Sequence, residues 1–335
     1  MQIHSQASLK SYNTFGLDAV AKTLAILESS DDVEKCFDEY PDGLVIGGGS
    51  NILLTQPLYD VVILNRIKGI EITEEKWNEV VIAVGSGENW HQLVLWTLKN
   101  NYGGLENLSL IPGTAGAAPI QNIGAYGAEL KDVLHGIDYF RYNDHANIFV
   151  PAEDCKFAYR DSIFKNDWKN KGFISRIYLR LTRHDQNVNT SYQALHNYLT
   201  EQGWNNPTIH QVSQAVIDIR QSKLPDWRKI GNAGSFFKNP VVSRSFYEKL
   251  TTDYPNAPSF PVDESNVKIP AAWLIQEAGF KGKRIDQVGT YQYQPLVLVN
   301  YGGGTADDLL QLKDEIKAAV ESKFGIALTP EVTIL

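Results

Sequence analysis

The chain has 335 residues, which is long enough for two or three domains. Hydrophobic residues make up 43% of the chain and charged residues 21%, as is typical of a folded soluble protein. The net charge of −8 argues against a nonspecific nucleic-acid binder, because such proteins need a basic surface. It leaves small anionic ligands open, since local clusters of Arg and Lys can oppose the overall sign.

No segment approaches the roughly 18 consecutive apolar residues of a membrane span, and residues 1–10 lack the apolar stretch of a signal peptide. The two cysteines, Cys36 and Cys155, belong to no CxxC pair, and the seven histidines form no HxxxH or HxH pair. We therefore expect two free thiols, no metal site, and a cytoplasmic protein with neither a membrane nor a nucleic-acid partner.

The first 68 residues predict a small α/β unit. Residues 19–27 alternate between apolar and polar as a strand does, and residues 29–40 open with a serine cap and an acidic turn, which predicts a helix. Residues 43–47 and 61–65 are short apolar runs typical of buried strands.

A second unit, residues 69–219, is expected to be rich in strands, and a third, α+β unit is expected at residues 220–324. The second unit combines predicted strands at 80–84, 132–142, 146–150 and 172–182 with predicted helices at 89–100 and 208–222. The third combines predicted helices at 242–251, 271–278 and 305–324 with a predicted strand at 296–300. Residues 326–335 predict a final strand that returns to an earlier sheet.

Two glycine-rich segments are the strongest signals of a binding site. Residues 111–127 carry no charge and consist largely of Gly, Ala and Pro, which interrupt helices and strands but let the backbone approach another group closely. Residues 45–51 form an apolar run that ends in a Gly-Gly-Gly-Ser-Asn turn. The turn is neither a GxGxxG motif, because Ile52 replaces the third glycine, nor a Walker loop. Such turns can cradle a large anionic ligand with backbone N–H groups, or they are two ordinary surface loops.

Three further side chains suit anion or acid–base chemistry. Arg160 lies in a loop between predicted strands, where it either clamps a carboxylate or forms a surface ion pair with Asp161. Ser235 lies between a glycine-rich turn and two aromatic residues; it either donates a proton in a partly dry pocket or only forms a turn, and no GxSxG elbow supports a nucleophile. Glu331 lies in an apolar run near the chain end, either exposed at a sheet edge or buried for acid–base work.

Taken together, these segments resemble one family, the UDP-N-acetylenolpyruvoylglucosamine reductases. The matching segments follow the family's order over nearly the whole chain: residues 13–16, 47–51, 111–127, 159–164, 231–240 and 330–331. The resemblance implies an α+β protein with an FAD-binding domain of the vanillyl-alcohol-oxidase/p-cresol-methylhydroxylase type, made of two α/β subdomains, and a C-terminal α+β substrate-binding domain. The subdomains would be residues 1–68 and 69–219, with 325–335 returning to them, and the substrate domain residues 220–324.

The resemblance also implies noncovalent FAD, because neither glycine-rich segment carries the His or Cys through which some relatives of this fold attach the flavin. The residues expected to bind FAD belong to these two segments: Gly47, Gly48, Gly49, Ser50, Asn51, Ile111, Pro112, Gly113, Thr114, Gly116, Ala117, Gln121, Asn122, Gly124, Ala125 and Tyr126.

The implied activity is NADPH-dependent reduction of the enolpyruvyl ether of UDP-N-acetylglucosamine to UDP-N-acetylmuramate in peptidoglycan precursor synthesis, by a monomer of the type I branch. By resemblance, Arg160 and Glu331 stabilise the enolic form of the substrate, and Ser235 gives a proton to its C2. The substrate contacts implied in the same way are Tyr192, Lys223, Asn239 and Gln294. Residues 291–294 read Tyr-Gln-Tyr-Gln, which departs from the His-containing run usual in the family.

Two other functions stay open at this point. One is a different FAD oxidoreductase of the same fold that acts on a sugar or an alcohol, in which reduced flavin reacts rapidly with oxygen. The other is a nucleotide-binding or electron-transfer subunit, which needs a partner and in which Arg160, Ser235 and Glu331 are structural.

Overall fold

The computed structural model describes residues 1–335. The chain divides into two compact units. Unit 1 contains residues 1–7, 21–48 and 58–222, and unit 2 contains residues 8–20, 49–57 and 223–335. Two short N-terminal segments therefore belong to the unit formed mainly by the C-terminal third, and the glycine turn at 47–51 is divided after Gly48.

A four-stranded sheet in unit 1 has the order β1-β2-β5-β3. Its strands are β1 (Gln2–Ser8), β2 (Val20–Leu27), β3 (Leu44–Ile46) and β5 (Leu58–Asn65). The chain passes from β2 to β3 through α1 (Val33–Glu39), and the short 3₁₀ turn before α1 is capped by Ser29, which accepts the N–H of Asp31. Phe37 of α1 packs against Phe140 and Phe173, so that this helix contributes to a small aromatic core.

The second sheet of unit 1 is antiparallel, with the order β11-β10-β12-β7-β6. Its strands are β6 (Ile70–Glu75), β7 (Glu79–Gly85), β10 (Leu134–Arg141), β11 (Asn147–Pro151) and β12 (Gly172–Thr182). The helix α2 (Trp90–Lys99) begins at Asn89, whose side chain accepts the N–H of Gln92. Its buried residues, among them Trp90 and Leu93, share the main core of this unit with the sheet.

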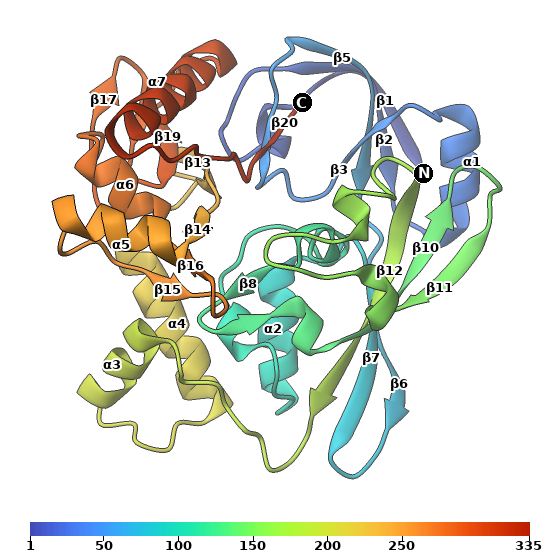
Figure 1. The fold of residues 1–335 in the computed structure, drawn as a ribbon. Helices are drawn as coiled ribbons and strands as arrows, with labels where there is room; N and C mark the ends of the chain where they lie inside the picture. Colours follow the sequence, from blue (N-terminus) through green and yellow to red (C-terminus); the bar gives the residue numbers. More distant parts are fainter. The chain divides into compact units, whose positions relative to one another are not determined.

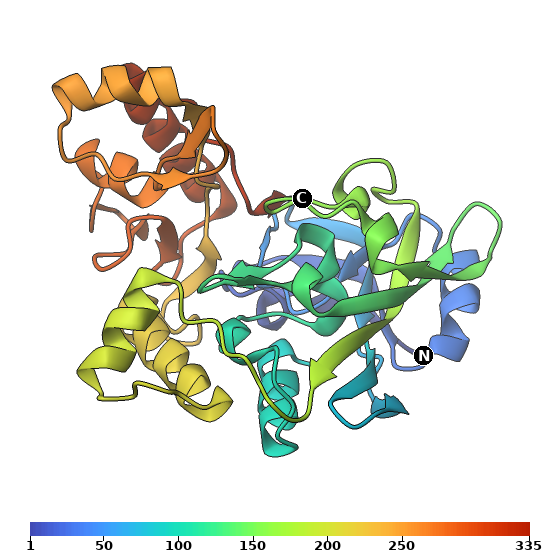
Figure 2. The same cartoon turned by 60° about the horizontal axis from the view of Figure 1, so that its bottom comes forward.

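Two further pairs of elements in unit 1 lie outside its two larger sheets. The helices α3 (Gln193–Glu201) and α4 (Ile209–Lys223) pack on each other, as Figure 2 shows, and bury Leu195, Leu199, Val212 and Val216 in a core of their own. The strands β8 (Gly124–Ala125) and β9 (Ala128–Glu129) form a small antiparallel hairpin.

Unit 2 is built on the four-stranded sheet β13-β19-β18-β17, beside which its helices are grouped (Figure 1). The sheet contains β13 (Gly231–Ser235), β17 (Arg284–Ile285), β18 (Val288–Thr290) and β19 (Val297–Asn300). The helices are α5 (Arg244–Asp253), α6 (Ala271–Glu277) and α7 (Ala306–Phe324). The remaining strands are β14 (Val241–Ser243), β15 (Phe260–Pro261) and β16 (Asn266–Lys268), which form a small sheet, and β4 (Ile52–Leu53) and β20 (Thr333–Ile334), which pair in parallel.

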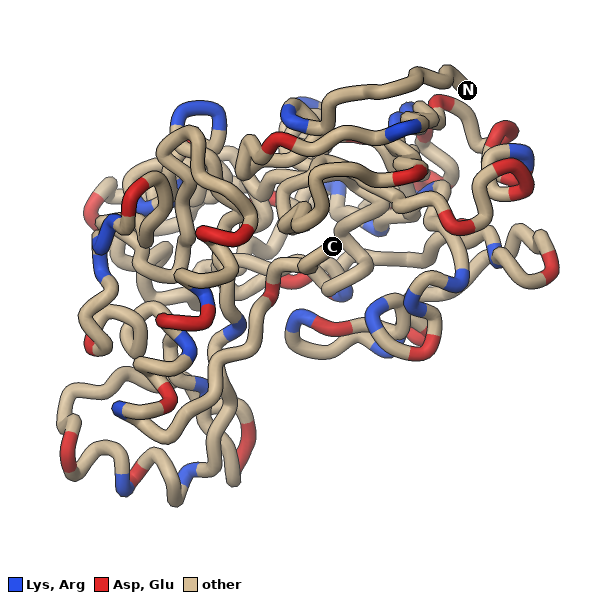
Figure 3. Tube along the Cα trace, turned by 90° about the horizontal axis from the view of Figure 1, so that it is seen from above, with Lys and Arg blue, Asp and Glu red and all other residues tan.

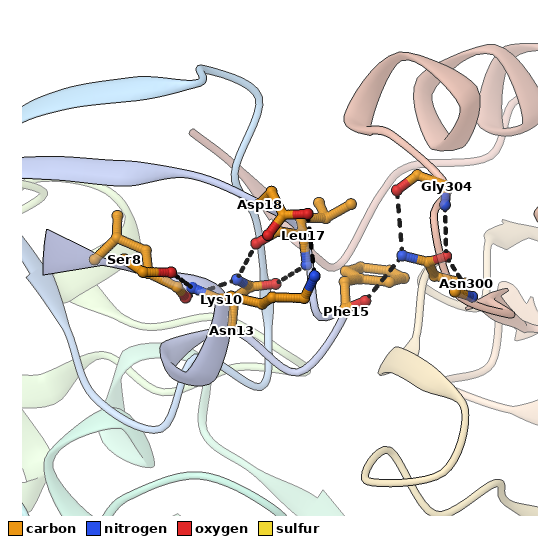
Figure 4. Close-up of polar contacts among 10 residues, drawn as sticks. Ser8, Lys10, Asn13, Phe15, Leu17, Asp18, Asn300 and Gly304 are labelled. Atoms are coloured by element: carbon orange, nitrogen blue, oxygen red, sulfur yellow. Dashed lines mark hydrogen bonds and ion pairs between the residues drawn. The ribbon is translucent and has the colours of Figure 1, made fainter.

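Two asparagines fix the N-terminal segment of unit 2 (Figure 4). Asn13 donates to the carbonyl groups of Leu9 and Leu17 and accepts the N–H of Leu17, which closes the loop that contains the Asn-Thr-Phe-Gly motif. Asn300, at the end of β19, donates to the carbonyl groups of Phe15 and Gly304. Both side chains are buried, so these bonds hold a segment from the start of the sequence in the core of the C-terminal unit.

The structure confirms most of the predicted elements. The six predicted helices are present as α1, α2, α4, α5, α6 and α7, and the serine cap predicted at residue 29 is present. The prediction of a strand over residues 326–335 is wrong for most of its length, because only Thr333–Ile334 pair. The strands β1, β4, β6, β8, β9 and β13–β18 and the helix α3 were not predicted. Of these, β1 and β6 are largely exposed and lack the apolar pattern of a buried strand.

Charged residues are mixed in sign along both units. Figure 3 shows Lys and Arg interspersed with Asp and Glu along the trace. None of the helices combines the length and the apolar character needed to cross a bilayer.

Both cysteines are free, as predicted, and both are buried. Burial raises the pKa of the Cys36 thiol from 9.0 to about 11 and the pKa of the Cys155 thiol to about 12. We expect neither thiol to react with a disulfide reagent in the native protein at pH 8, because the thiolate is the reactive form. A colorimetric thiol assay should count none in buffer and two in denaturant. Rapid labelling of the native protein at this pH would contradict the burial.

The same pKa shifts predict how stability depends on pH. Because the folded-state pKa values are raised, the thiols favour the folded state fully below pH 9, and this contribution is lost as the pH rises toward 11. Replacing both cysteines with alanine should flatten the alkaline limb of the unfolding free energy, measured by urea titration between pH 8 and pH 11. An alkaline limb as steep as that of the wild type would assign the loss of stability to other groups.

Candidate functional site

The two glycine-rich turns of unit 1 pack directly on each other. A Cβ added at Gly48 would lie 2.7 Å from the Cα of Gly113, and one added at Gly47 would lie 2.5 Å from Oγ1 of Thr114. Only glycine allows this approach at position 48, since the groups that a side chain would meet there are backbone. The segments 45–51 and 111–127, far apart in the chain, therefore lie side by side where both belong to unit 1.

This contact leaves donors without partners. The N–H groups of Gly48 and Gly113 donate to no backbone carbonyl, and the hydroxyl of Thr114 is enclosed without a hydrogen-bond partner. Gly48 is exposed, Gly113 is half-buried and Thr114 is buried, so water can satisfy the N–H of Gly48, whereas the enclosed hydroxyl of Thr114 would normally have a partner. Two N–H groups and a hydroxyl in one place suit an anion such as a pyrophosphate, so the residues present fit a dinucleotide cofactor.

The rest of the segment 111–127 folds into 3₁₀ turns and the β8–β9 hairpin. The N–H of Gly116 donates to Ser86, and Ser86 also blocks any side chain at this position, because a Cβ would lie 2.4 Å from its own. Asn122 uses its amide within the protein: Nδ2 donates to Glu129 and to the carbonyl of Ala158, and Oδ1 accepts the N–H of Lys131. Asn122 thus holds the loop that precedes Arg160 rather than pointing its amide to a ligand.

Arg160 lies in a two-residue turn between Ala158 and Asp161, which form an isolated bridge. Its backbone is left-handed, with φ of 53°, which is uncommon for a residue with a side chain and is often found at functional sites. Its Nη2 donates to the carbonyl of Gly124 over 2.7 Å. The hydroxyl of Ser162 donates to Ile120, so this turn is fastened to the glycine-rich segment on both sides of Arg160.

A second guanidinium, which sequence reasoning missed, belongs to the same cluster. Arg220 of α4 is half-buried, and its Nε is enclosed without a hydrogen-bond partner. Burial lowers the pKa of Arg220, and the charge of Arg160 lowers it further, whereas Tyr126 acts in the opposite direction. The charge of Arg160 therefore acts on Arg220, and no carboxylate is among the causes of the shift of this pKa. Such an arrangement favours an anionic ligand.

The sequence carries only a partial signal for Arg220. It continues the apolar stripe of its helix, which consists of Ile209, Val212, Val216 and Ile219, at a position where a charged side chain is rarely buried without a purpose.

His91 of α2 lies near Arg220 in its neutral form. Burial lowers the pKa of His91, and the charge of Arg220 lowers it further. Its Nδ1 accepts the N–H of Leu110 over 3.0 Å, which leaves the proton on Nε2. The histidine therefore adds no third positive charge.

Two tyrosines complete the site within unit 1. Tyr126, at the tip of the β8–β9 hairpin, meets Tyr192 edge to face, with 5.4 Å between ring centroids. Tyr192 precedes α3 and is 41% exposed, so one face of this expected substrate contact is accessible. Burial raises the pKa of Tyr126, which keeps its hydroxyl protonated and able to donate.

Unit 2 brings the other two predicted catalytic residues together. Ser235 ends β13 opposite Val297, directly after an irregularity in the strand at which Gly234 has φ of 68°. The N–H of Glu331 donates to the carbonyl of Phe236, the residue after Ser235, over 2.8 Å. The sequence placed Glu331 inside a strand; instead it follows an isolated bridge at Pro330, because proline lacks the N–H that would continue the pairing.

Other residues that were expected at the site also belong to unit 2. Asn51 donates to the carbonyl of Glu331, so it lies beside that residue. Asn239 accepts the N–H of Ala271 at the start of α6, and Lys223, at the end of α4, is exposed. Gln294 is half-buried, and its enclosed Oε1 has no hydrogen-bond partner.

The predicted site residues are thus grouped by unit. Unit 1 brings Arg160, Tyr126 and Tyr192 into one cluster with the glycine turns, and unit 2 brings Asn51, Ser235 and Glu331 into another. No group of His, Cys, Asp and Glu side chains is arranged to hold a metal ion.

Known proteins resemble this chain over its whole length. A family described as "FAD binding domain" matches residues 22–144, and one described as "UDP-N-acetylenolpyruvoylglucosamine reductase, C-terminal domain" matches residues 225–335. Proteins named UDP-N-acetylenolpyruvoylglucosamine reductase from Flavobacterium johnsoniae and Amoebophilus asiaticus are each 42% identical to the chain, and in both cases the alignment covers 100% of both proteins. One from Photorhabdus laumondii is 43% identical, over 98% of this chain and 96% of its own.

The crystal structure of the reductase of this name from Thermus caldophilus superimposes with a TM-score of 0.68 at 23% identity, and the match covers 100% of this chain and 99% of that one. The predicted fold class is confirmed: an FAD-binding domain of the vanillyl-alcohol-oxidase/p-cresol-methylhydroxylase type followed by a C-terminal domain of the reductase kind. With identity above 40% over the full length of several such proteins, the chain belongs to the UDP-N-acetylenolpyruvoylglucosamine reductase family.

Proposed function

We propose that the protein reduces the enolpyruvyl ether of UDP-N-acetylglucosamine to UDP-N-acetylmuramate, with NADPH as reductant and noncovalently bound FAD, in the cytoplasmic synthesis of peptidoglycan precursors. The observation that carries the proposal is the 42% identity to reductases of this name over the full length of the chain. The side chains that this chemistry needs are present: guanidinium groups in unit 1, and a hydroxyl close to a carboxyl residue in unit 2.

When bound, FAD would accept a hydride from NADPH and deliver it to C3 of the enolpyruvyl group. The N–H groups of Gly48 and Gly113 and the hydroxyl of Thr114 would hold its pyrophosphate, since these donors have no partner in the protein. Binding would be noncovalent, because the segments 45–54 and 111–127 contain neither His nor Cys.

Arg160 and Arg220 would bind the carboxylate of the substrate. Negative charge spreads onto that group as hydride reaches C3, and fixed guanidinium groups in a partly dry site stabilise such a developing charge strongly. Ser235 would give its hydroxyl proton to C2, and Glu331, whose backbone is bonded to the residue after Ser235, would stabilise the same enolic form. Four residues would contact the sugar nucleotide, with Lys223 acting as a point charge on the diphosphate: Tyr192, Lys223, Asn239 and Gln294.

We further propose that the molecule acts as a monomer and that the three predicted segments, 1–68, 69–219 and 220–324, correspond to the two subdomains for FAD and one domain for the UDP-sugar. The competing function is an FAD oxidase of the same fold acting on a sugar or an alcohol. Rapid reoxidation of the reduced flavin by oxygen, without any dependence on the enolpyruvyl nucleotide, would favour that alternative.

The first test is a flavin spectrum in three steps. We expect a yellow protein whose visible absorbance is bleached by NADPH under anaerobic conditions and restored by the enolpyruvyl nucleotide. A colourless preparation that takes up no added FAD would reject the proposal, and a bleached flavin that the nucleotide does not reoxidise would reject the substrate.

The replacement Ser235→Ala separates the two half-reactions. Bleaching by NADPH should stay within about twofold of the wild-type rate, and reoxidation by the nucleotide should slow by at least about a thousandfold, because general acid catalysis at this level needs a positioned donor. Stopped-flow absorbance measures both rates. The exposed Ser265→Ala is the matched control and should change neither. Equal loss in both half-reactions would remove Ser235 from the role of proton donor.

The replacement Arg220→Met tests the second cation. It keeps an unbranched side chain and removes a half-buried charge that lies beside another cation, so the free energy of unfolding should stay unchanged or rise by up to about 2 kcal/mol. The dissociation constant of the enolpyruvyl nucleotide should rise by about tenfold or more, because a charge-assisted hydrogen bond is lost. Urea titration and equilibrium dialysis give the two quantities. Lower stability with unchanged affinity would show that Arg220 is structural.

A further inference from the structure

The hairpin that carries Tyr126 has an unusual turn. Tyr126 and Gly127 are the two residues between β8 and β9, and both have positive φ, 49° and 85°. This is the pattern of a type I′ turn, in which Asn, Asp or Gly normally occupies the first position. A tyrosine in the left-handed region is strained, so contacts outside the hairpin must hold it there.

Two asparagines supply those contacts. Asn107, which is buried in a short 3₁₀ turn, donates one N–H to the carbonyl of Tyr126 and the other to the backbone carbonyl of Asn189, both over 2.8 Å. The side chain of Asn189 donates to the carbonyl of Gly127 over 2.9 Å. Both carbonyl groups of the turn are therefore bound, and the orientation of the Asn107 amide is fixed, since its oxygen could not face two carbonyl oxygens.

Asn189 also organises the segment that leads to Tyr192. Its Oδ1 accepts the N–H of Ser191 over 3.0 Å and the hydroxyl of Ser191 over 2.7 Å, which forms a local turn. Tyr192 follows directly and meets Tyr126 edge to face. One end of the segment is thus tied to the hairpin through Asn107 and Asn189, while Tyr192 itself stays 41% exposed.

We propose that Asn107 and Asn189 are positioning residues that clamp the Tyr126–Gly127 turn to the segment 189–192 and so hold Tyr192 where it closes on the sugar nucleotide. The role of Tyr192 rests on the proposed function, whereas the clamp itself does not. Because the hairpin also belongs to the segment expected to bind FAD, the clamp links the cofactor side of unit 1 to its substrate side. Two links carry the coupling: Asn107 binds the backbone carbonyl groups of both segments, and the side chain of Asn189 adds a direct bond to Gly127.

The replacement Asn189→Asp separates the clamp from the local turn. An aspartate keeps the oxygen that accepts from Ser191 but loses the N–H that binds Gly127, and it sets a negative oxygen against that carbonyl. Ser191→Ala is the matched control, because it weakens the local turn and leaves the bonds between the segments in place. Asn189 and Ser191 are both exposed, so both variants should fold, which thermal melting verifies.

Two measurements on the full-length flavin-loaded protein test the proposal. In the first, hydrogen exchange without substrate, Asn189→Asp should speed exchange at least about tenfold in both 124–129 and 189–196, and Ser191→Ala should affect only the second segment. In the second, steady-state kinetics, Asn189→Asp should raise the KM for the enolpyruvyl nucleotide about tenfold, the equivalent of one lost hydrogen bond, with the rate of flavin bleaching by NADPH unchanged.

The outcomes are distinguishable. Unchanged exchange in 124–129 for Asn189→Asp would overturn the clamp, whatever the kinetics. Faster exchange with an unchanged KM would overturn its effect on Tyr192. If the wild-type protein does not turn over the nucleotide, the proposed function fails, while the exchange measurement still decides whether the two segments are clamped. Asn107→Asp gives a second, independent variant, for which the same exchange pattern is expected.

Discussion

The burial of Arg220 beside a second guanidinium is the constraint that organises unit 1. Burying a cation costs free energy, and the Nε of the half-buried Arg220 has no hydrogen-bond partner, while the charge of Arg160 adds to the cost. The neighbouring groups are consistent with that arrangement. His91 is held neutral, with its Nδ1 bound to a backbone N–H, and Tyr126 stays protonated. Two like charges in one cluster repel each other, and an anion bound between them would relieve that repulsion.

Local signals explain why most of the fold could be predicted from the sequence. The caps at Asn89 and Thr305 involve residues three positions away, so the residues that begin each helix also show in the sequence where it begins. The glycines of the two turns are also visible in the sequence, and with them the close backbone approach that a residue without a side chain allows. What the sequence could not reveal is the partner of each glycine: the contact of Gly48 with Gly113 joins segments far apart in the chain.

The errors at the candidate site depend in part on distant groups, which the local pattern does not show. Glu331 was expected in a strand from its apolar neighbours, but Pro330 interrupts the pairing, and Asn51 and Phe236 then hold the residue. Arg220 continues an apolar stripe of its helix. From the sequence, a single charged residue at that position is equally compatible with a buried and with an exposed side chain. Its role becomes visible only when Arg160, from another loop, is found beside it.

Residues with side chains and left-handed backbone show where neighbouring segments restrain the loops of unit 1. Four residues with side chains adopt positive φ in the loops around the two guanidinium groups: Leu110, Asn122, Tyr126 and Arg160. Each costs about 1 kcal/mol or more, so none would persist without specific restraint. A hydrogen bond from another segment restrains each of them, since Leu110 donates to His91, Asn122 spans two loops, Asn107 holds Tyr126, and Arg160 is bound to the hairpin. Because these restraints come from neighbouring segments, each loop keeps its left-handed residue only as long as its neighbour stays in place.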